Sequence, residues 1–168
     1  MKPIMKKMRA DKERFSALLE KNKGIIHKIS LIYTNNTADK ADLFQDICLQ
    51  LWRSYTNFRN DAQFSTWLYR VALNTAISQV RKKKVLDVEE YRELYSENSD
   101  SETDEKTKLL FRAIARLNKI DRALILLWLE KKKYEEIAEI LGISKSNVSV
   151  KLVRIKEKLS EIIKSFKK

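Results

Sequence analysis

The residues best suited to chemistry lie close together in the C-terminal third of the chain. Residues 134–152 read YEEIAEILGISKSNVSVKL, with apolar side chains at the fourth, eighth, tenth and fifteenth positions. This spacing is typical of a helix-turn-helix, whose two helices share a small core. Gly142 falls at the turn, where a left-handed backbone costs little only for glycine, and Ser144 can cap the second helix. An ordinary corner between two helices is the alternative interpretation.

The second helix of this motif separates into two faces when about 100° is allowed per residue. One face is predicted to be core and carries Val148, Leu152, Ile155, Leu159 and Ile162. Val150 and Val153 lie on the opposite side, where an apolar side chain suits the thymine methyl group in a major groove. Arg154, beside them, suits guanine or a phosphate. This face therefore predicts sequence-specific contact with duplex DNA.

Cationic residues flank the predicted recognition helix. Asn147 and Lys151 lie at the edge of its outward face, and Lys145 precedes them. Lys145, Lys151 and the run Lys131–Lys133 suit phosphate contacts, which position a protein on DNA but carry no sequence information. A solvated loop is the alternative interpretation of the lysine run.

A second set of polar and cationic residues follows a helix predicted at about 64–84. At helical spacing it carries Thr66, Arg70, Asn74, Ile77 and Arg81, and it ends in three lysines. The loop before this helix is flanked by the aromatic residues Phe58, Phe64 and Trp67. Aromatic rings and cations together suit unpaired nucleic acid, because bases stack or enter pockets while cations follow the backbone.

The elements that must position these residues are helices. The 168 residues include only two glycines and one proline. An all-β fold needs turn residues every 8–12 positions or so, and a dinucleotide or P-loop site needs a glycine cluster, so both are excluded. At 43% hydrophobic residues the chain can bury a core. We therefore predict an all-α fold with helices at about 10–34, 39–55, 64–84, 106–117, 120–130, 134–141 and 144–165.

Charge divides the chain into three parts. Residues 1–86 hold 17 basic and 7 acidic side chains, net +10, and residues 106–168 hold the same numbers. Residues 87–105 hold 1 basic and 9 acidic side chains, net −8. An acidic stretch with few apolar residues is typical of an exposed linker. The sequence thus predicts two small helical domains, 1–85 and 107–168, joined by an acidic flexible linker, 86–106. The basic surfaces of the two domains suit a polyanion.

Several site classes and locations are disfavoured. The single cysteine, Cys48, and the single histidine, His27, cannot form a zinc site or a disulfide framework, so we expect no metal and no cofactor. No apolar run approaches the roughly 18 residues of a membrane span, and no hydrophobic signal segment follows the N-terminus. We expect a cytoplasmic protein without membrane insertion.

Two longer segments resemble a known family. Residues 42–84, DLFQDICLQLW…FRNDAQFSTWLYRVALNTA…RKKK, resemble region 2 of extracytoplasmic-function (ECF) sigma factors. Residues 117–159, LNKIDRALILLWLEKKKYEEIAEILGISKSNVSVKLVRIKEKL, resemble their region 4. The resemblance implies a dissociable, non-enzymatic initiation subunit of bacterial RNA polymerase. It would be a monomer when free, bind core polymerase and promoter DNA, and be regulated by an anti-sigma factor.

The resemblance also implies site residues. The helix face that would bind polymerase maps onto Asp42, Gln45, Asp46 and Leu49. The loop that captures a flipped base of the −10 element, with the helix behind it, maps onto Phe58, Arg59, Asn60, Asp61, Ala62, Gln63, Phe64, Arg70 and Asn74. Contacts to bases of the −35 element map onto Ser149, Val150, Val153 and Arg154. Family linkers pass through the polymerase toward its RNA path, and a net −8 segment suits that place.

Two other classes were weighed. A stand-alone helix-turn-helix regulator would bind duplex DNA without polymerase, usually as a dimer on a palindrome. A DNA recombinase would need a catalytic serine or tyrosine set among arginines or carboxylates, and the sequence shows no second cluster of that kind.

Overall fold

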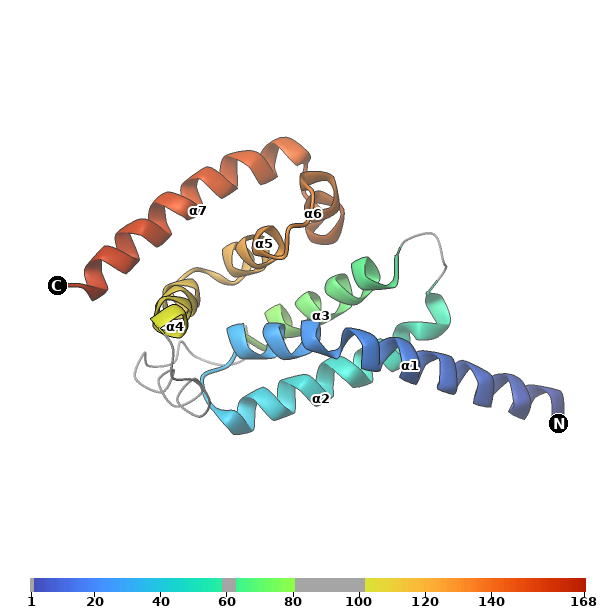
Figure 1. Ribbon diagram of the computed structural model, residues 1–168. Coiled ribbons are helices and arrows are strands. Elements are labelled where there is room, and N and C mark those ends of the chain that lie inside the picture. The colour runs from blue at the N-terminus through green and yellow to red at the C-terminus, as the bar shows by residue number, and fades with distance from the viewer. Residues whose placement is uncertain (1, 59–62, 81–101) are drawn as a thin grey trace.

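The computed structural model describes residues 2–58, 63–80 and 102–168, and every regular element among them is helical (Figure 1). In chain order these are α1 (Lys2–Ile32), α2 (Thr37–Ser54), the short 3₁₀ helix η1 (Tyr55–Asn57), α3 (Phe64–Val80), α4 (Glu102–Ala115), α5 (Lys119–Leu129), α6 (Tyr134–Leu141) and α7 (Lys145–Phe166). The prediction of an all-α fold is confirmed.

The first three helices pack around one apolar core. Fully buried side chains come from each of them and include Ile26, Ile29, Leu43, Ile47, Leu51, Leu68 and Leu73. The Asn36 side chain caps α2 by accepting a hydrogen bond from the backbone N–H of Asp39 at 2.8 Å. This cap satisfies a helix-end donor that would otherwise lack a partner, which accounts for where α2 begins.

The core faces of α2 and α3 differ in detail from the expected ones. The helical spacing of residues 39–55 pairs Leu51 with Trp52 on one apolar face, which predicts that both are buried, yet the Trp52 side chain is 42% exposed. On α3 the buried residues are Thr66, Leu68, Tyr69, Ala72, Leu73 and Ala76. The helical spacing of residues 64–84 also places Phe64, Trp67 and Val71 in one apolar stripe, yet these three side chains are only partly buried, at the edge of the core. In both helices the side chains at the margin of the apolar face were assigned too far inward.

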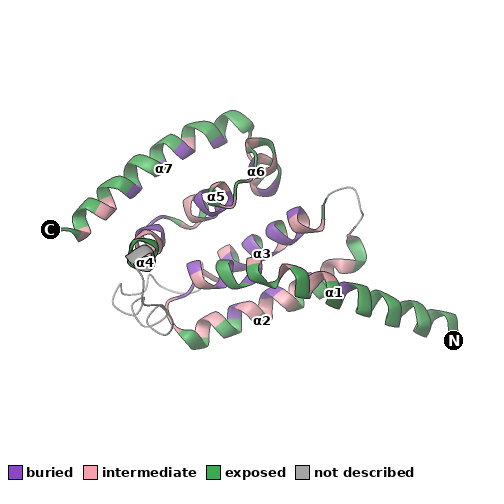
Figure 2. Cartoon of the chain, in the orientation of Figure 1, coloured by how far each residue is buried: buried purple, intermediate pink, exposed green. Residues whose placement is uncertain are grey.

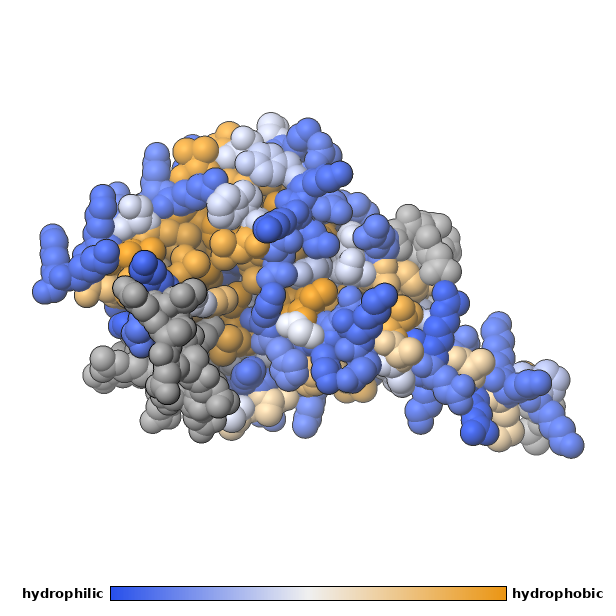
Figure 3. All heavy atoms as spheres, in the orientation of Figure 1, coloured by the Kyte–Doolittle hydropathy of each residue, from blue (hydrophilic) through white to orange (hydrophobic). Residues whose placement is uncertain are grey.

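Helix α1 begins earlier than expected and extends past the other two. Residues 2–14 are all exposed, among them Ile4, Met5 and Met8, each about two-thirds exposed. Figure 1 shows this end projecting beyond α2 and α3, and Figure 3 shows its surface as mostly hydrophilic with apolar residues between. Among the described residues, nothing covers it.

The last four helices add further apolar side chains, which join those of the first three in one continuous buried cluster. The buried side chains of this half include Ile114 of α4, Leu117 just after it, five consecutive residues of α5 from Ala123 to Leu127, and Ile137 of α6. Helix α7 contributes Val148, Leu152, Ile155 and Leu159 along one side (Figure 2). Asn118 caps α5 as Asn36 caps α2, accepting from the backbone N–H of Asp121 at 2.9 Å.

The two halves of the molecule lie against each other, with α3 against α5 and α6 and α1 against α4. Most of the predicted linker, 86–106, lies outside the described residues. Its last part belongs to α4, which begins at Glu102.

Candidate nucleic-acid interface

The turn between α6 and α7 has the geometry of a helix-turn-helix. Gly142 adopts a left-handed conformation, φ 67° and ψ 35°, as the sequence predicted. The Ser144 hydroxyl accepts a hydrogen bond from the backbone N–H of Asn147 at 3.1 Å and so caps α7. The Glu136 carboxylate accepts from the backbone N–H of Lys133 at 2.9 Å and closes the start of α6. Side-chain oxygens thus accept hydrogen bonds from backbone N–H groups at the start of both helices, which fixes where each helix begins.

Helix α7 presents a core face and an open face. Val148 and Leu152 are 0% and 1% exposed, whereas Val150 and Val153 are 49% and 57% exposed. The predicted division of the helix is therefore confirmed. Lys145, Asn147, Ser149 and Arg154 are also exposed, and Lys151 is half-buried. Two apolar side chains held open to solvent beside an arginine form a surface that suits base edges in a major groove.

Lys145 has a protein partner in this structure. Its ammonium group lies 2.6 Å from the Glu135 carboxylate, an ion pair that joins α7 to α6 across the turn. The hydrogen bond from Lys145 holds the pKa of Glu135 below its ordinary value. Both side chains are more than half exposed, so a phosphate can compete with Glu135 for this lysine.

The second predicted site lies at the start of α3. Gln63, Arg70 and Asn74 are exposed, and Phe58 and Phe64 are half-buried. Arg59, Asn60, Asp61, Ala62 and Arg81 lie outside the described residues. The structure therefore shows the two ends of the predicted base-capture loop and the helix behind it.

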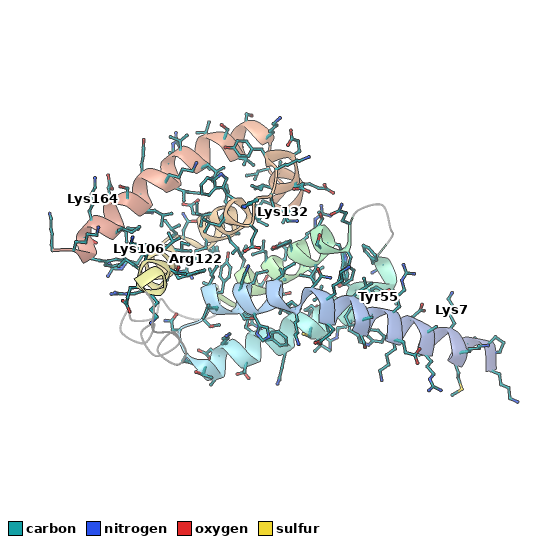
Figure 4. All side chains as sticks on the ribbon, in the orientation of Figure 1. Lys7, Tyr55, Lys106, Arg122, Lys132 and Lys164 are labelled. Atoms are coloured by element: carbon teal, nitrogen blue, oxygen red, sulfur yellow. The ribbon has the colours of Figure 1, made fainter. Side chains whose placement is uncertain are left out.

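An aromatic cluster holds those two ends together. The Phe58 ring lies 5.6 Å from that of Phe64 and 5.0 Å from that of Trp67, measured between centroids. The Phe64 and Trp67 rings are 5.4 Å apart. The cluster continues through Tyr55, which lies 6.2 Å from Phe58 (Figure 4). Aromatic contacts of this kind stabilise a defined arrangement of the rings. Trp67 packs against Tyr55, Phe58 and Phe64 and so supports both ends of the loop.

The helix face predicted to bind polymerase lies on α2. Asp42 and Gln45 are exposed, and Leu49 is 44% exposed. Asp46 is half-buried, and its carboxylate accepts a hydrogen bond from the Gln79 amide of α3. This bond fixes the position of Asp46 relative to the rest of the face.

The family matches favour the sigma-factor class over the two alternative classes. The family described as Sigma-70 region 2 matches residues 18–85, and the family described as Sigma-70, region 4 matches residues 107–159. Together the two matches cover most of the chain, in the order that the motifs predicted. The chain belongs to the ECF group of the sigma-70 family.

Relatives of this sigma factor align over nearly its whole length. It is 23% identical over 154 residues to the ECF RNA polymerase sigma factor SigM of Mycobacterium tuberculosis, covering 91% of this chain and 79% of SigM. It is 28% identical over 169 residues to the ECF RNA polymerase sigma-E factor of Haemophilus influenzae, covering 91% of this chain and 89% of that one.

Solved structures share the fold of this sigma factor. The sigma factor RpoE, in complex with the anti-sigma factor NepR from Bartonella quintana, has a TM-score of 0.70 at 19% identity, covering 90% of this chain and 98% of RpoE. CnrH, in complex with the cytosolic domain of CnrY, has a TM-score of 0.68 at 19% identity, covering 92% and 90%. Both support the all-α arrangement of two sigma regions.

One exposed apolar residue, Trp52, was predicted to face the core and so was not assigned to the polymerase-binding face. Trp52 lies one turn of α2 after Leu49, and the two are the large apolar side chains that this helix exposes. Its ring also packs 5.1 Å from that of Phe15 in α1. Its position at the margin of the apolar face was the sequence feature that could have indicated its exposure. Trp52 extends the candidate polymerase-binding face by one turn.

Other site types find no support among the described residues. No group of three or more His, Cys, Asp or Glu side chains lies close enough there to hold a metal ion. None of the helices described is both long and apolar enough to cross a membrane.

Proposed function

We propose that this chain binds core RNA polymerase and directs it to promoters by reading two DNA elements. Region 4 would read the −35 element through the open face of α7. Region 2 would hold the unpaired −10 strand at α3 and the loop before it. The observation that carries the proposal is the exposure of Val150 and Val153, at 49% and 57%, on an otherwise polar helix face. Exposed valines beside Arg154 suit base recognition.

At the −10 element, the proposal assigns base capture to the loop 58–64 and strand contacts to Arg70, Asn74 and Arg81. Extracting a base from its stack costs a few kcal/mol, which the pocket must offset with specific contacts. The aromatic cluster supports this assignment, because Phe58, Phe64 and Trp67 brace both ends of the loop at centroid distances of 5.0–5.6 Å.

At the polymerase, the proposal assigns binding to Asp42, Gln45, Asp46 and Leu49. The exposed carboxylate of Asp42 suits a basic partner surface, and the 44% exposed Leu49 supplies apolar area. Lys145, Asn147, Ser149 and Lys151 would complete the −35 interface. The proposed domain limits are 1–85 for region 2, 86–106 for the linker and 107–168 for region 4.

The protein would act as a monomeric binding subunit in the cytoplasm, with no catalytic step and no cofactor. We also propose an anti-sigma partner. Support comes from the two structures of similar fold, each of which was solved with a protein partner.

The experiment that tests this function is transcription by core polymerase from a randomised promoter library, with and without the purified chain. Transcripts that depend on the chain should enrich two separated motifs upstream of their start sites. A stand-alone regulator would instead bind duplex DNA in the absence of polymerase and enrich a single palindrome. Enrichment of no motif would contradict the proposed function.

The acidic linker has a proposed role of its own. Residues 87–105 carry a net charge of −8, which suits a polymerase channel that carries RNA. Replacing its nine acids with serine should change the ratio of abortive to full-length transcripts, measured on a gel at one promoter. An unchanged ratio would contradict this role of the linker, but it would not contradict the proposed promoter recognition.

A further inference from the structure

The first turns of α1 separate apolar from charged side chains. Over residues 2–9 the large apolar residues are Ile4, Met5 and Met8, which are 67%, 68% and 65% exposed. With about 100° of rotation per residue, these three side chains share an arc of about 100°. The cationic residues of the same turns all fall outside that arc and are Lys2, Lys6, Lys7 and Arg9. The segment therefore has the pattern of a basic amphipathic helix.

The exposed apolar arc continues the core face of the same helix. By the same projection, Ile4 and Met8 lie within about 40° of Phe15. Phe15 is 6% exposed, because the rings of Trp52 and Tyr55 lie 5.1 Å and 5.0 Å from its own, measured between centroids. Trp52 lies near the end of α2 and Tyr55 begins η1, and α1 projects beyond both (Figure 1). The apolar face thus loses its cover where the neighbouring elements end.

Positive charge accompanies the uncovered face. Residues 2–14 hold six cationic and two acidic side chains, net +4. One of the acids, Glu13, forms an ion pair with Arg9 at 3.4 Å, but both side chains are more than two-thirds exposed. An exposed pair of this kind is weak, so another anion can compete for the arginine. Lys7 lies on the same projecting part of the helix (Figure 4). The segment combines apolar area with attraction for an anionic surface.

The placement of the charges distinguishes between possible occupants. A nucleic-acid strand would contact the cationic side and leave the three apolar side chains in water. A second copy of the chain would bring two segments of net +4 together, and their repulsion opposes this. A bilayer surface suits both sides of the helix. The apolar side chains enter the acyl boundary, while the lysine and arginine stems extend to anionic headgroups.

We propose that residues 2–14 of α1 bind an anionic lipid surface, with the helix lying in the plane of the bilayer without crossing it. Three apolar side chains give only weak attachment, so anionic headgroups are needed and binding is reversible. This segment contains none of the residues assigned to DNA or polymerase, and the inference does not depend on those assignments. It adds that the sigma factor can be held at a membrane surface.

The test measures co-sedimentation of the full chain with lipid vesicles. One set of vesicles contains phosphatidylcholine with about 30% phosphatidylglycerol, an anionic lipid, and the other contains phosphatidylcholine alone. The apolar variant combines Ile4→Gln with Met8→Gln, which keeps the net charge and introduces a good helix former. Its matched control combines Ile120→Gln with Leu129→Gln, which removes two apolar side chains of α5 that are each 36% exposed.

A second pair of variants tests the charge. Lys6→Gln with Lys7→Gln removes two cations from the segment, and the matched control, Lys158→Gln with Lys164→Gln, removes two from exposed positions of α7. The wild type should bind the neutral vesicles at least about tenfold more weakly than the anionic ones. On anionic vesicles, the apolar variant should lose about fivefold in affinity and the charge variant about tenfold. Both controls should stay within about twofold of the wild type.

Circular dichroism of each variant should match that of the wild type, since every replaced side chain is exposed. Failure of the wild type to bind anionic vesicles would overturn the proposal and favour a groove on an acidic protein as the occupant. Equal binding by the wild type and the apolar variant would also overturn it, because the attraction would then come from charge alone. So would equal losses in the charge variant and its control. The assay contains no polymerase or promoter, so its outcome is independent of the transcription test.

Discussion

At the scale of single residues, the outward face of α7 is the part of the site that the sequence predicted best. Val148 and Leu152 had to be buried because they continue a helical apolar stripe, which left Val150 and Val153 outside it. The Lys145–Glu135 pair was not predicted, because it depends on how α6 and α7 cross. Trp52 was misplaced because periodicity alone does not decide the burial of a side chain at the edge of a face.

The role of Val150 can be tested by replacing it with serine. Val150→Ser should reduce transcription about fivefold, equivalent to about 1 kcal/mol, from promoters that carry thymine at the facing −35 base. Promoters with another base there are the control and should change little. An equal loss at every base would show that the valine does not read this position.

The single histidine gives a pH prediction. The His27 ring stacks on that of Phe44 at 4.4 Å, and its pKa lies below the ordinary value of 6.5 because partial desolvation and the charges of Lys40 and Lys23 disfavour the protonated ring. The unfolded chain therefore binds the proton more readily than the folded chain. Folding stability should fall as the pH drops below about 6.5, until the lower folded pKa is passed.

The control for this prediction is His27→Gln, which removes the titrating group. Between pH 7 and pH 5.5, the free energy of unfolding measured with urea should fall more steeply for the wild type than for the variant. Parallel pH profiles would show that His27 does not cause the loss of stability at low pH.

At the scale of elements, most helix boundaries follow from local signals. Asn36, Asn118 and Ser144 each cap a helix, and Gly142 ends one, as short-range sequence rules predict. The start of α1 could not be predicted from such a signal. Residues 2–9 are mostly good helix formers, and Pro3 is tolerated in a first turn because no backbone N–H is needed there. The absence of a cap or a buried face left this segment without a sequence signal.

The two glycines should respond oppositely to alanine. Gly142→Ala forces a side chain into a left-handed conformation and should destabilise region 4 by about 1–2 kcal/mol. Gly24→Ala lies within α1, where the added methyl group meets nothing within 4 Å, and should stabilise the chain by about 0.5–1 kcal/mol. Thermal denaturation checks both. Equal shifts in one direction would contradict the assigned backbone roles.

At the scale of the whole molecule, the sequence indicated two basic halves and left their relative placement undetermined. The contacts that join them, such as Arg70 with Glu139 and Tyr33 with Lys119, link residues 69 and 86 positions apart. Helical periodicity cannot predict contacts between residues so far apart, because nothing in the pattern of either helix distinguishes the residue that makes the contact. The family match gives the identity of the two regions, and the structure adds how they dock.

The central claim is that one chain, bound to one polymerase, reads two DNA elements at the same time. The most direct test takes a promoter enriched from the library and lengthens the segment between its two motifs by about five base pairs, half a helical turn. The chain and core polymerase should then lose most run-off transcription from that promoter. An insertion of about ten base pairs, a full helical turn, should give a different loss, because it returns the two motifs to the same face of the DNA. Transcription that is unaffected by either insertion would contradict simultaneous reading by the two regions.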